Sequence, residues 1–179
     1  MKLKGSHAYD APLEAVLAVL GDESATIAKY ESMGHRDVKV VENERGDGSL
    51  RVVSSRVVDV DLPGFAKRVL RPTNTMRQTD TWTRATDDSW EGTFDVEVQG
   101  APIHISGSMI LTASDGKTVH DVDLRVDVKV PIIGGRIADW AGKGDVRRSL
   151  DGEFSFNARR LREHPFVPAP STKRAPRRA

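Results

Sequence analysis

The segment at residues 75–85, TMRQTDTWTRA, places polar groups where a protein core is expected. Because side chains alternate between the two faces of a strand, Gln78, Asp80 and Trp82 share one face. If Trp82 packs in the core, an amide and a carboxylate are buried beside it, and burying each without a partner costs several kcal/mol. The pattern therefore indicates a wet cavity or a charged partner, for which Arg56 on the preceding strand is the candidate. The alternative is a solvent-facing strand with Trp82 packed at an edge.

The histidines are the other side chains suited to acid–base chemistry. They lie far apart in the sequence and lack the spacing of metal ligands. His120 points inward, in phase with the apolar residues of its strand, whereas His104 points outward. The two interpretations of His120 are a hydrogen-bonded core residue and a functional group. With no cysteine and no HExxH, P-loop or GxSxG motif, the sequence predicts no metal and no cofactor and assigns no catalytic residue.

A second candidate site lies on the C-terminal helix that is predicted from residue 132 to residue 164. One stripe of this helix is apolar at both ends and polar in the middle, where Gly144 removes bulk and Arg147 forms an i, i+4 pair with Asp151. This stripe predicts a pocket with a polar anchor. The alternative is that the glycines of the helix loosen or break it. The stripe then rotates, and the packed residues are Val146, Leu150 and Phe154.

The elements that must position these side chains follow from hydrophobic periodicity. The pattern predicts one strand, two short helices, six strands and one long helix, in that order. Their ranges are 2–9, 13–20, 23–33, 38–43, 50–60, 75–85, 90–98, 103–113, 118–130 and 132–164. Strands joined by turns this short must pair antiparallel. Because the strands alternate apolar and polar residues, one face of the sheet is buried, and the long helix is its predicted cover.

Composition indicates an ordinary globular protein. The 179 residues suit one domain, with 38% hydrophobic and 30% charged residues. No apolar run approaches the roughly 20 residues of a membrane span, and no apolar segment of a secretory signal follows the N-terminal lysines. The lack of cysteine agrees with a reducing compartment. We therefore expect a cytoplasmic protein.

Basic residues concentrate at the C-terminal end. The last fifteen residues contain four basic and no acidic residues, and subtracting these charges from the net charge of +1 leaves −3 for the rest. We predict a domain over residues 1–163 and a basic, Pro/Ala-rich disordered tail over residues 164–179. A net-acidic body with so few tail charges predicts no nucleic-acid partner. The tail is either a solvated terminus or an arm that makes the chain an interaction module.

Residues 61–72, DLPGFAKRVLRP, interrupt the strands with apolar and basic side chains together. As a functional segment, they form a lid over a cavity that makes transient contact with a membrane or with an anionic head group. As a structural segment, they form a crossover loop that caps the sheet with Phe65, Val69 and Leu70. The two interpretations are compatible.

The glycine pair Gly134–Gly135 lies between the last strand and the long helix. A P-loop needs further glycines and a Lys-Ser/Thr pair, and a dinucleotide site needs a parallel βαβ unit. Neither is present, so we interpret the pair as the hinge that lays the helix across the sheet.

The order of elements resembles the helix-grip fold (START/Bet v 1-like) of the START-like, polyketide-cyclase-like superfamily. Four motifs carry a narrower resemblance to an uncharacterised, domain-of-unknown-function family within this superfamily (SRPBCC): LPGF at 62–65, Gln78 with Trp82, APIHISGSMIL at 101–111, and VKVPIIGGRI at 128–137. The resemblance covers residues 1–163. It implies an α+β fold with a curved antiparallel sheet of about seven strands wrapped around the C-terminal helix, and a cavity for an apolar or amphipathic small molecule.

We therefore expect the chain to bind or carry a hydrophobic or amphipathic small molecule, lipid-like or polyketide-like, without catalysis. One alternative is an aromatase/cyclase-like enzyme in which Arg56, Asp80 and His120 move protons on a polyketide-type substrate. A second alternative is an interaction module that binds a partner through the basic tail. The sequence leaves open whether a reaction is catalysed. The predicted ligand-binding residues are Arg56, Gln78, Asp80, Trp82, Phe94, Met109, His120, Trp140, Gly144 and Arg147.

Overall fold

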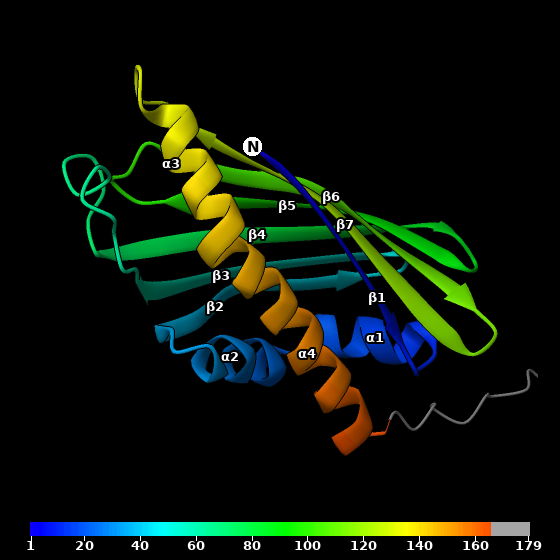
Figure 1. Ribbon diagram of the computed structural model, residues 1–179. Helices are drawn as coiled ribbons and strands as arrows, with labels where there is room; N and C mark the ends of the chain where they lie inside the picture. The colour runs from blue at the N-terminus through cyan, green and yellow to red at the C-terminus, as the bar shows by residue number, and fades with distance from the viewer. Residues whose placement is uncertain (166–179) are drawn as a thin grey trace, which may run out of the picture.

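The computed structural model describes residues 1–165 of the chain. They form seven strands, two short helices and a long C-terminal helix with one wider turn (Figure 1). The strands are β1 (Lys2–Tyr9), β2 (Arg36–Gly46), β3 (Ser49–Asp59), β4 (Thr73–Thr86), β5 (Ser89–Val98), β6 (Ile103–Ser114) and β7 (Lys117–Val128). The helices are α1 (Leu13–Leu20), α2 (Glu23–Ser32), α3 (Gly134–Ala141), the π-helical turn η1 (Gly142–Val146) and α4 (Arg147–Glu163). The basic tail that the sequence predicts lies outside the described residues from position 166 onward.

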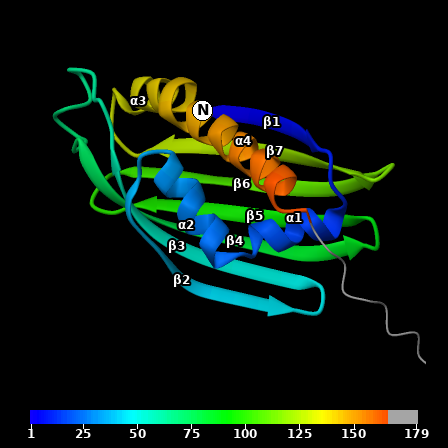
Figure 2. The ribbon, with the colours of Figure 1, turned by 90° about the horizontal axis from the view of Figure 1, so that it is seen from below.

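The strands form one antiparallel sheet in the order β1-β7-β6-β5-β4-β3-β2. Strands β2 to β7 follow one another as a meander, and the N-terminal β1 lies at the edge beside β7. Figure 2 shows that the sheet is curved and that the helices lie on one of its faces. The predicted α+β helix-grip architecture is confirmed, with a seven-stranded sheet around a long helix and two short helices after the first strand.

The alternation of residues along the strands decides which face of the sheet is buried. In β7, Val122, Leu124 and Val126 are buried, whereas Asp121 and Asp123 are exposed. Burying a valine or leucine side chain fully contributes about 1.5 to 3 kcal/mol. The inward face therefore holds the helices against the sheet, and the polar residues on this face stand out as exceptions.

The chain leaves the sheet after β7 and turns back as α3. Ile132 makes this reversal with a φ of 69°, a left-handed conformation that is uncommon for a β-branched residue. Gly134 begins α3 so close to the strand that a Cβ there would lie 2.6 Å from the carbonyl oxygen of Val128. Gly134 therefore permits α3 to approach the backbone of β7 closely, while Ile132 is the residue in the left-handed conformation.

Residues 61–72 form a crossover between β3 and β4 that packs on α3. The buried residues of this segment, which contact Ile137 of α3, are Leu62, Ala66 and Leu70. The guanidinium of Arg136 lies 4.0 Å from the centroid of the Phe65 ring. The segment caps one end of the apolar core as the structural interpretation expects, but of the three expected residues only Leu70 is buried, and Phe65 and Val69 are half-buried against the cluster.

The long helix changes phase at η1. A π-helical turn bonds residue i to i+5 and therefore holds one residue more than an α-helical turn. The extra residue rotates α4 relative to the phase of a continuous α-helix. The residues that pack against the core on this side are Val146, Leu150 and Phe154. The helix therefore has the irregularity expected as the alternative from its glycines. The prediction that one continuous stripe through Gly144 and Arg147 faces the sheet is wrong.

The ring of Phe94 lies over Gly107 of the neighbouring strand. A Cβ at Gly107 would lie 2.2 Å from the carbonyl oxygen of Asp123 and 2.6 Å from the Phe94 ring. We expect Gly107→Ala to destabilise the protein by about 1 to 3 kcal/mol, because the backbone or the ring must move. The control is Gly135→Ala in α3, where a Cβ meets open space and the free energy of unfolding should stay equal or rise slightly. Urea unfolding measures both variants, and equal stabilities would contradict the close packing.

Candidate functional site

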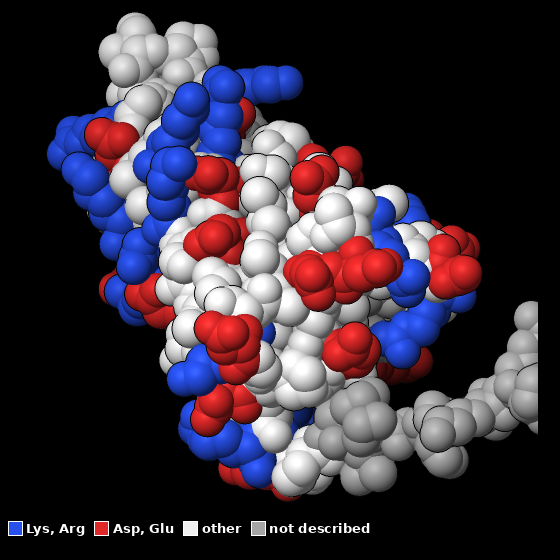
Figure 3. Space-filling model, turned by 90° about the vertical axis from the view of Figure 1, so that its right-hand side faces the viewer, with Lys and Arg blue, Asp and Glu red and all other residues white. Residues whose placement is uncertain are grey.

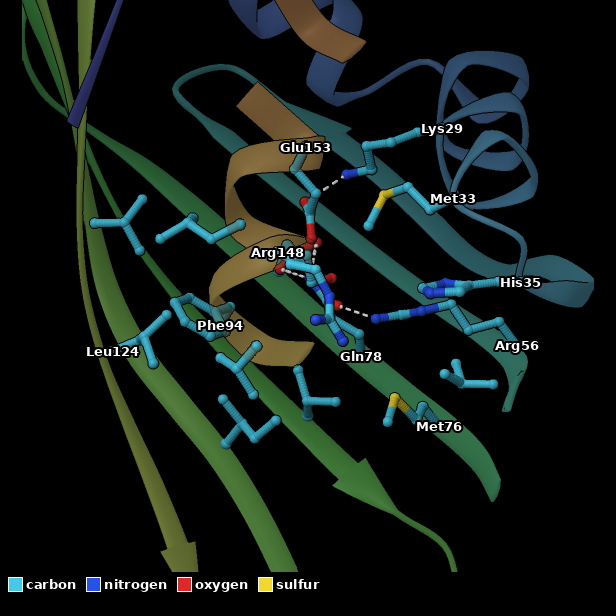
Figure 4. A pocket seen from close by; sticks show the side chains of 18 of the residues that line it. Lys29, Met33, His35, Arg56, Met76, Gln78, Phe94, Leu124, Arg148 and Glu153 are labelled. Carbon is cyan, nitrogen blue, oxygen red and sulfur yellow. Dashed lines mark hydrogen bonds and ion pairs between the residues drawn. The ribbon is translucent and has the colours of Figure 1, made fainter. Parts of the chain in front are cut away.

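A cavity of about 510 Å³ lies between the sheet and helices α2 and α4 (Figure 4). This volume is within the usual range of small-molecule sites. Gly34, Asp59 and Arg148 border the cavity and are exposed, so its mouth lies between the end of α2, the end of β3 and the start of α4. Seven of the ten predicted ligand-binding residues line its wall: Arg56, Gln78, Asp80, Trp82, Phe94, Met109 and His120.

Gln78 connects the polar side chains of this cavity. Its Oε1 accepts hydrogen bonds from the Tyr30 hydroxyl at 3.1 Å and from Arg56 Nη2 at 2.8 Å. Its Nε2 donates to Asp80 Oδ1 at 2.9 Å. Trp82 is buried on the same face of β4. The predicted inward polar face with Arg56 nearby is therefore confirmed, and the solvent-facing alternative is wrong.

Arg56 is a buried cation, since only 4% of its surface is exposed. It has few hydrogen-bond partners. Its guanidinium carbon lies 3.8 Å from the centroid of the Tyr30 ring, which is a cation–π contact. Apart from the bond to Gln78, it has one long contact of 3.5 Å with Ser54 Oγ, and its Nε has no hydrogen-bond partner. Among residues 1–165, no carboxylate oxygen lies within 4.0 Å of this guanidinium. The guanidinium at the cavity wall therefore has no carboxylate in direct contact, although its charge favours the ionised form of both Asp80 and Glu153.

Lys29 of α2 and Glu153 of α4 form an ion pair at the cavity. The Nζ–Oε2 distance is 2.8 Å, and the side chains are 9% and 24% exposed. Burial opposes the charged form of each group, but the attraction between them outweighs burial, so the pKa of Lys29 is raised and the pKa of Glu153 is lowered. Both groups stay charged at neutral pH, and the pair joins α2 to α4.

Asp80 differs from Glu153 because no cation pairs with it directly. Burial raises the pKa of its carboxyl group above the usual value, and the Lys29 charge and the Gln78 hydrogen bond offset this effect only in part. The polar end of the cavity therefore combines a self-neutralised ion pair, a carboxyl group of reduced acidity and the unpaired Arg56.

His120 presents a second group without a partner. It is 5% exposed, and neither ring nitrogen has a hydrogen-bond partner among the described residues. Its neighbours are the aromatic rings of Tyr9, Trp82 and Phe154. Burial lowers the pKa of His120 to about 4, so the ring is neutral at pH 7 and has one donor and one acceptor unused. No protein group among residues 1–165 therefore supplies the hydrogen bond expected of a core histidine, and the ring faces the cavity.

Much of the remaining cavity wall is apolar. In Figure 4, Phe94 and Leu124 lie on the side opposite Arg56 and His35. The sheet strands β5, β6 and β7 contribute the apolar lining residues Phe94, Val96, Ile105, Met109, Val122 and Leu124, and further apolar residues, among them Met33 and Met76, lie on the side of Arg56 and His35. The cavity thus has one polar and one apolar end, which suits a molecule with the same division.

The three remaining predicted residues lie outside the cavity wall: Trp140, Gly144 and Arg147. Trp140 packs with the apolar residues of α3 and the 61–72 segment. Arg147 is 46% exposed, pairs with Asp151 at 3.1 Å and donates to the carbonyl oxygen of Lys4. For Arg147 the reason is the phase change at η1, which turns Glu153 rather than Arg147 toward the cavity, whereas Trp140 precedes η1 and is held by its packing on the 61–72 segment.

Sequence reasoning missed several polar residues of the wall: Lys29, His35, Glu153 and Asn157. On α4, a helical face that starts at Val146 passes through Glu153 and Asn157, so this signal exists once the phase is set after η1. Lys29 has no comparable local signal, because its partner lies 124 positions away.

Charged residues of both signs cover the surface shown in Figure 3. Lysines and arginines gather toward the side formed by β1 and the C-terminal helix, and acidic residues lie between and beside them. Some are paired, as Lys4 is with Asp123 and Arg147 with Asp151. Exposed pairs of this kind contribute about 0 to 1 kcal/mol each. The buried charges at the cavity therefore matter more to the protein than these surface pairs.

Residues 1–165 can also be searched for a metal site and for a membrane-spanning helix. No group of three or more His, Asp or Glu side chains in this part of the chain is arranged to hold a metal ion. No helix in the same range combines the length and the apolar character that crossing a bilayer requires.

The family comparison identifies one match. A family model described as "Protein of unknown function (DUF2505)" matches residues 4–161, which is nearly the whole folded region. No curated protein sequence matches the chain at a significant level.

Solved structures share the fold over most of the chain. The protein TTHA0849 from Thermus thermophilus is 15% identical, has a TM-score of 0.59, and aligns over 88% of this chain and 97% of its own. The ZhuI aromatase/cyclase from Streptomyces sp. R1128 is 17% identical with a TM-score of 0.59, over 93% and 99% of the two chains. Ara h 8.0201 is 14% identical with a TM-score of 0.56, over 92% and 99%. Likeness at these identities shows the fold alone.

Proposed function

The chain belongs to the DUF2505 family of proteins of unknown function, and we propose that it is a START-like protein that binds or carries a hydrophobic or amphipathic small molecule without catalysing a reaction. The observation that carries the proposal is the cavity of about 510 Å³ between the sheet and α4, apolar at one end and polar at the other. A cavity of this size with a few converging polar groups is the usual form of a small-molecule site.

The fold supports the same proposal in a general way. Its likeness to an aromatase/cyclase and to Ara h 8.0201 extends over nearly the full length of those chains. In this chain the polar residues of the cavity come from β3, β4, β7, α2 and α4, so the fold surrounds one enclosed volume with side chains from distant segments.

The cyclase alternative has weaker support. A general base works best with a pKa near the working pH, whereas burial lowers the pKa of His120 to about 4. Arg56 and Asp80 bond to Gln78, but His120 bonds to neither of them. The three residues therefore lack the hydrogen-bonded relay that activates a nucleophile or a base.

A tryptophan that fills the cavity tests the proposal. Ile105 lines the apolar end of the cavity, and Ile105→Trp should occupy the space of a ligand. We expect the wild type to bind the neutral fluorescent probe Nile red and the variant to bind it at least tenfold more weakly. Ser108→Trp is the control, because Ser108 is an exposed residue on the same strand. Fluorescence titration measures both affinities.

Native mass spectrometry of the freshly purified protein gives a second measurement. A co-purified small molecule in the wild type, lost in Ile105→Trp and kept in Ser108→Trp, would support the proposal. The proposal fails if the wild type carries no small molecule and also binds Nile red no better than Ile105→Trp does.

A further inference from the structure

We infer that the ligand is an amphipathic monocarboxylate whose carboxylate pairs with Arg56 and whose apolar part lies against the opposite wall. This inference rests on the proposed function and names the chemical class of the molecule that the cavity takes. The observation behind it is a buried guanidinium at the cavity wall with no carboxylate within 4.0 Å among residues 1–165.

The hydrogen-bonding capacity of Arg56 is largely unused. A guanidinium has five N–H groups. Arg56 makes one good bond, to Gln78 Oε1 at 2.8 Å, and one long contact, to Ser54 Oγ at 3.5 Å. One face of the guanidinium is covered by the Tyr30 ring. A ligand therefore meets the guanidinium at its N–H edge, where a planar carboxylate can accept two parallel hydrogen bonds.

The other charges at the polar end act on Arg56 without contacting its guanidinium. Lys29 and Glu153 neutralise each other at 2.8 Å. Asp80 accepts from Gln78 and forms no ion pair with Arg56, and burial makes its carboxyl group a weaker acid. A buried cation that no carboxylate contacts is only partly compensated, so an anion that enters the cavity and bonds to it stabilises the charged guanidinium.

The count of charges selects a monoanion. Arg56 supplies one positive charge at the cavity wall that no carboxylate among residues 1–165 contacts directly. A phosphate monoester carries close to two negative charges at neutral pH, and the second would be buried near Glu153 without compensation. A carboxylate matches both the charge and the planar geometry.

The position of His120 adds a second preference. Its neutral ring has a donor and an acceptor without a hydrogen-bond partner among residues 1–165, and it lies among the rings of Trp82 and Phe154, close enough to Lys29 and Glu153 for their charges to act on it. A hydroxyl or keto oxygen on the apolar part of the ligand would satisfy one of these nitrogens. The favoured ligand is therefore a carboxylic acid that carries such an oxygen beyond its head group.

Three probes with the same chain test the head group: decanoate, 1-decanol and decyl phosphate. Each is titrated against Nile red displacement at pH 7.5. We expect decanoate to bind about 10- to 100-fold more tightly than decanol, the range for a charge-assisted hydrogen bond, and more tightly than decyl phosphate. Equal affinities for decanoate and decanol would overturn the inference and leave the proposed function standing. If none of the probes and no Nile red binds, the proposed function fails instead.

Arg56→Met tests the residue. Replacing a buried charge with an apolar side chain of similar volume is often neutral or stabilising, so we expect a folded protein. The preference for decanoate over decanol should fall to less than about threefold, whereas Arg51→Met, an arginine on the same strand that pairs with Glu42, should keep it. A preference that survives Arg56→Met would overturn the assignment.

A spectroscopic measurement on the wild type keeps the inference testable if Arg56→Met does not fold. Decanoate labelled with ¹³C at the carboxyl carbon reports its ionisation through its chemical shift. Beside Arg56, the pKa of the bound acid should be lower than that of the free acid. A bound carboxyl group that titrates at or above the free value would overturn the inference.

Discussion

Replacing Glu153 with glutamine should destabilise the protein by about 3 to 5 kcal/mol, the usual cost of leaving one member of a buried ion pair without its partner. Lys29 has 9% of its side chain exposed and meets Glu153 at 2.8 Å, so the ammonium has no route to full hydration when the carboxylate is removed. The glutamine keeps the size of the side chain, and the loss therefore reports charge rather than packing. Urea unfolding at pH 7.5 measures it.

The matched control lies on the same helix. Asp151→Asn breaks the exposed Arg147–Asp151 pair, whose side chains are 46% and 54% exposed, and should cost less than about 1 kcal/mol. The double variant Lys29→Met/Glu153→Leu removes both charges and should recover most of the stability lost in Glu153→Gln. A loss in Glu153→Gln no larger than in Asp151→Asn would show that the Lys29–Glu153 pair is not effectively buried.

The strands of this protein are predictable because a period of two assigns each side chain to a face directly. Alternation alone puts Gln78, Asp80 and Trp82 on one face, and if that face is inward, the cost of burying the first two points to a cavity. All seven strand residues predicted for the site line that cavity. The polar exceptions on an otherwise apolar face thus carry most of the information about the site.

The helix was less predictable, for a geometric reason. One additional residue in η1 changes the direction of every side chain that follows it, so Arg147 faces solvent and Glu153 faces the cavity. Gly142 and Gly144 indicate where such a turn can form, but they do not fix its phase. The Lys29–Glu153 pair depends on two helices meeting across the cavity, and no local pattern encodes such a meeting.

A buried histidine also links the cavity to the stability of the fold. Burial lowers the pKa of His120 to about 4 from its ordinary value of 6.5. As the pH falls below 6.5, His120 is protonated in the unfolded chain but stays neutral in the folded protein. The free energy of unfolding therefore decreases between pH 6.5 and pH 4. The contribution of His35, whose pKa is also lowered to about 4 by burial and then by Arg56, has the same sign. The carboxylate of Glu153 has a lowered pKa, so the stability it contributes is lost at lower pH, below its ordinary value of 4.5.

We therefore expect the wild type to lose about 2 kcal/mol through His120 on going from pH 8 to pH 5, and about 3 kcal/mol by pH 4. His120→Leu removes the titrating group, so its loss over the same interval should be smaller by these amounts, whatever its stability at pH 8. His164→Gln, which removes an exposed histidine, should follow the wild type. Urea unfolding at half-unit steps of pH measures the three curves. If His120→Leu and the wild type lose stability in parallel, His120 is protonated in the folded protein as easily as in the unfolded chain, and the cavity around it is wetter than its aromatic neighbours imply.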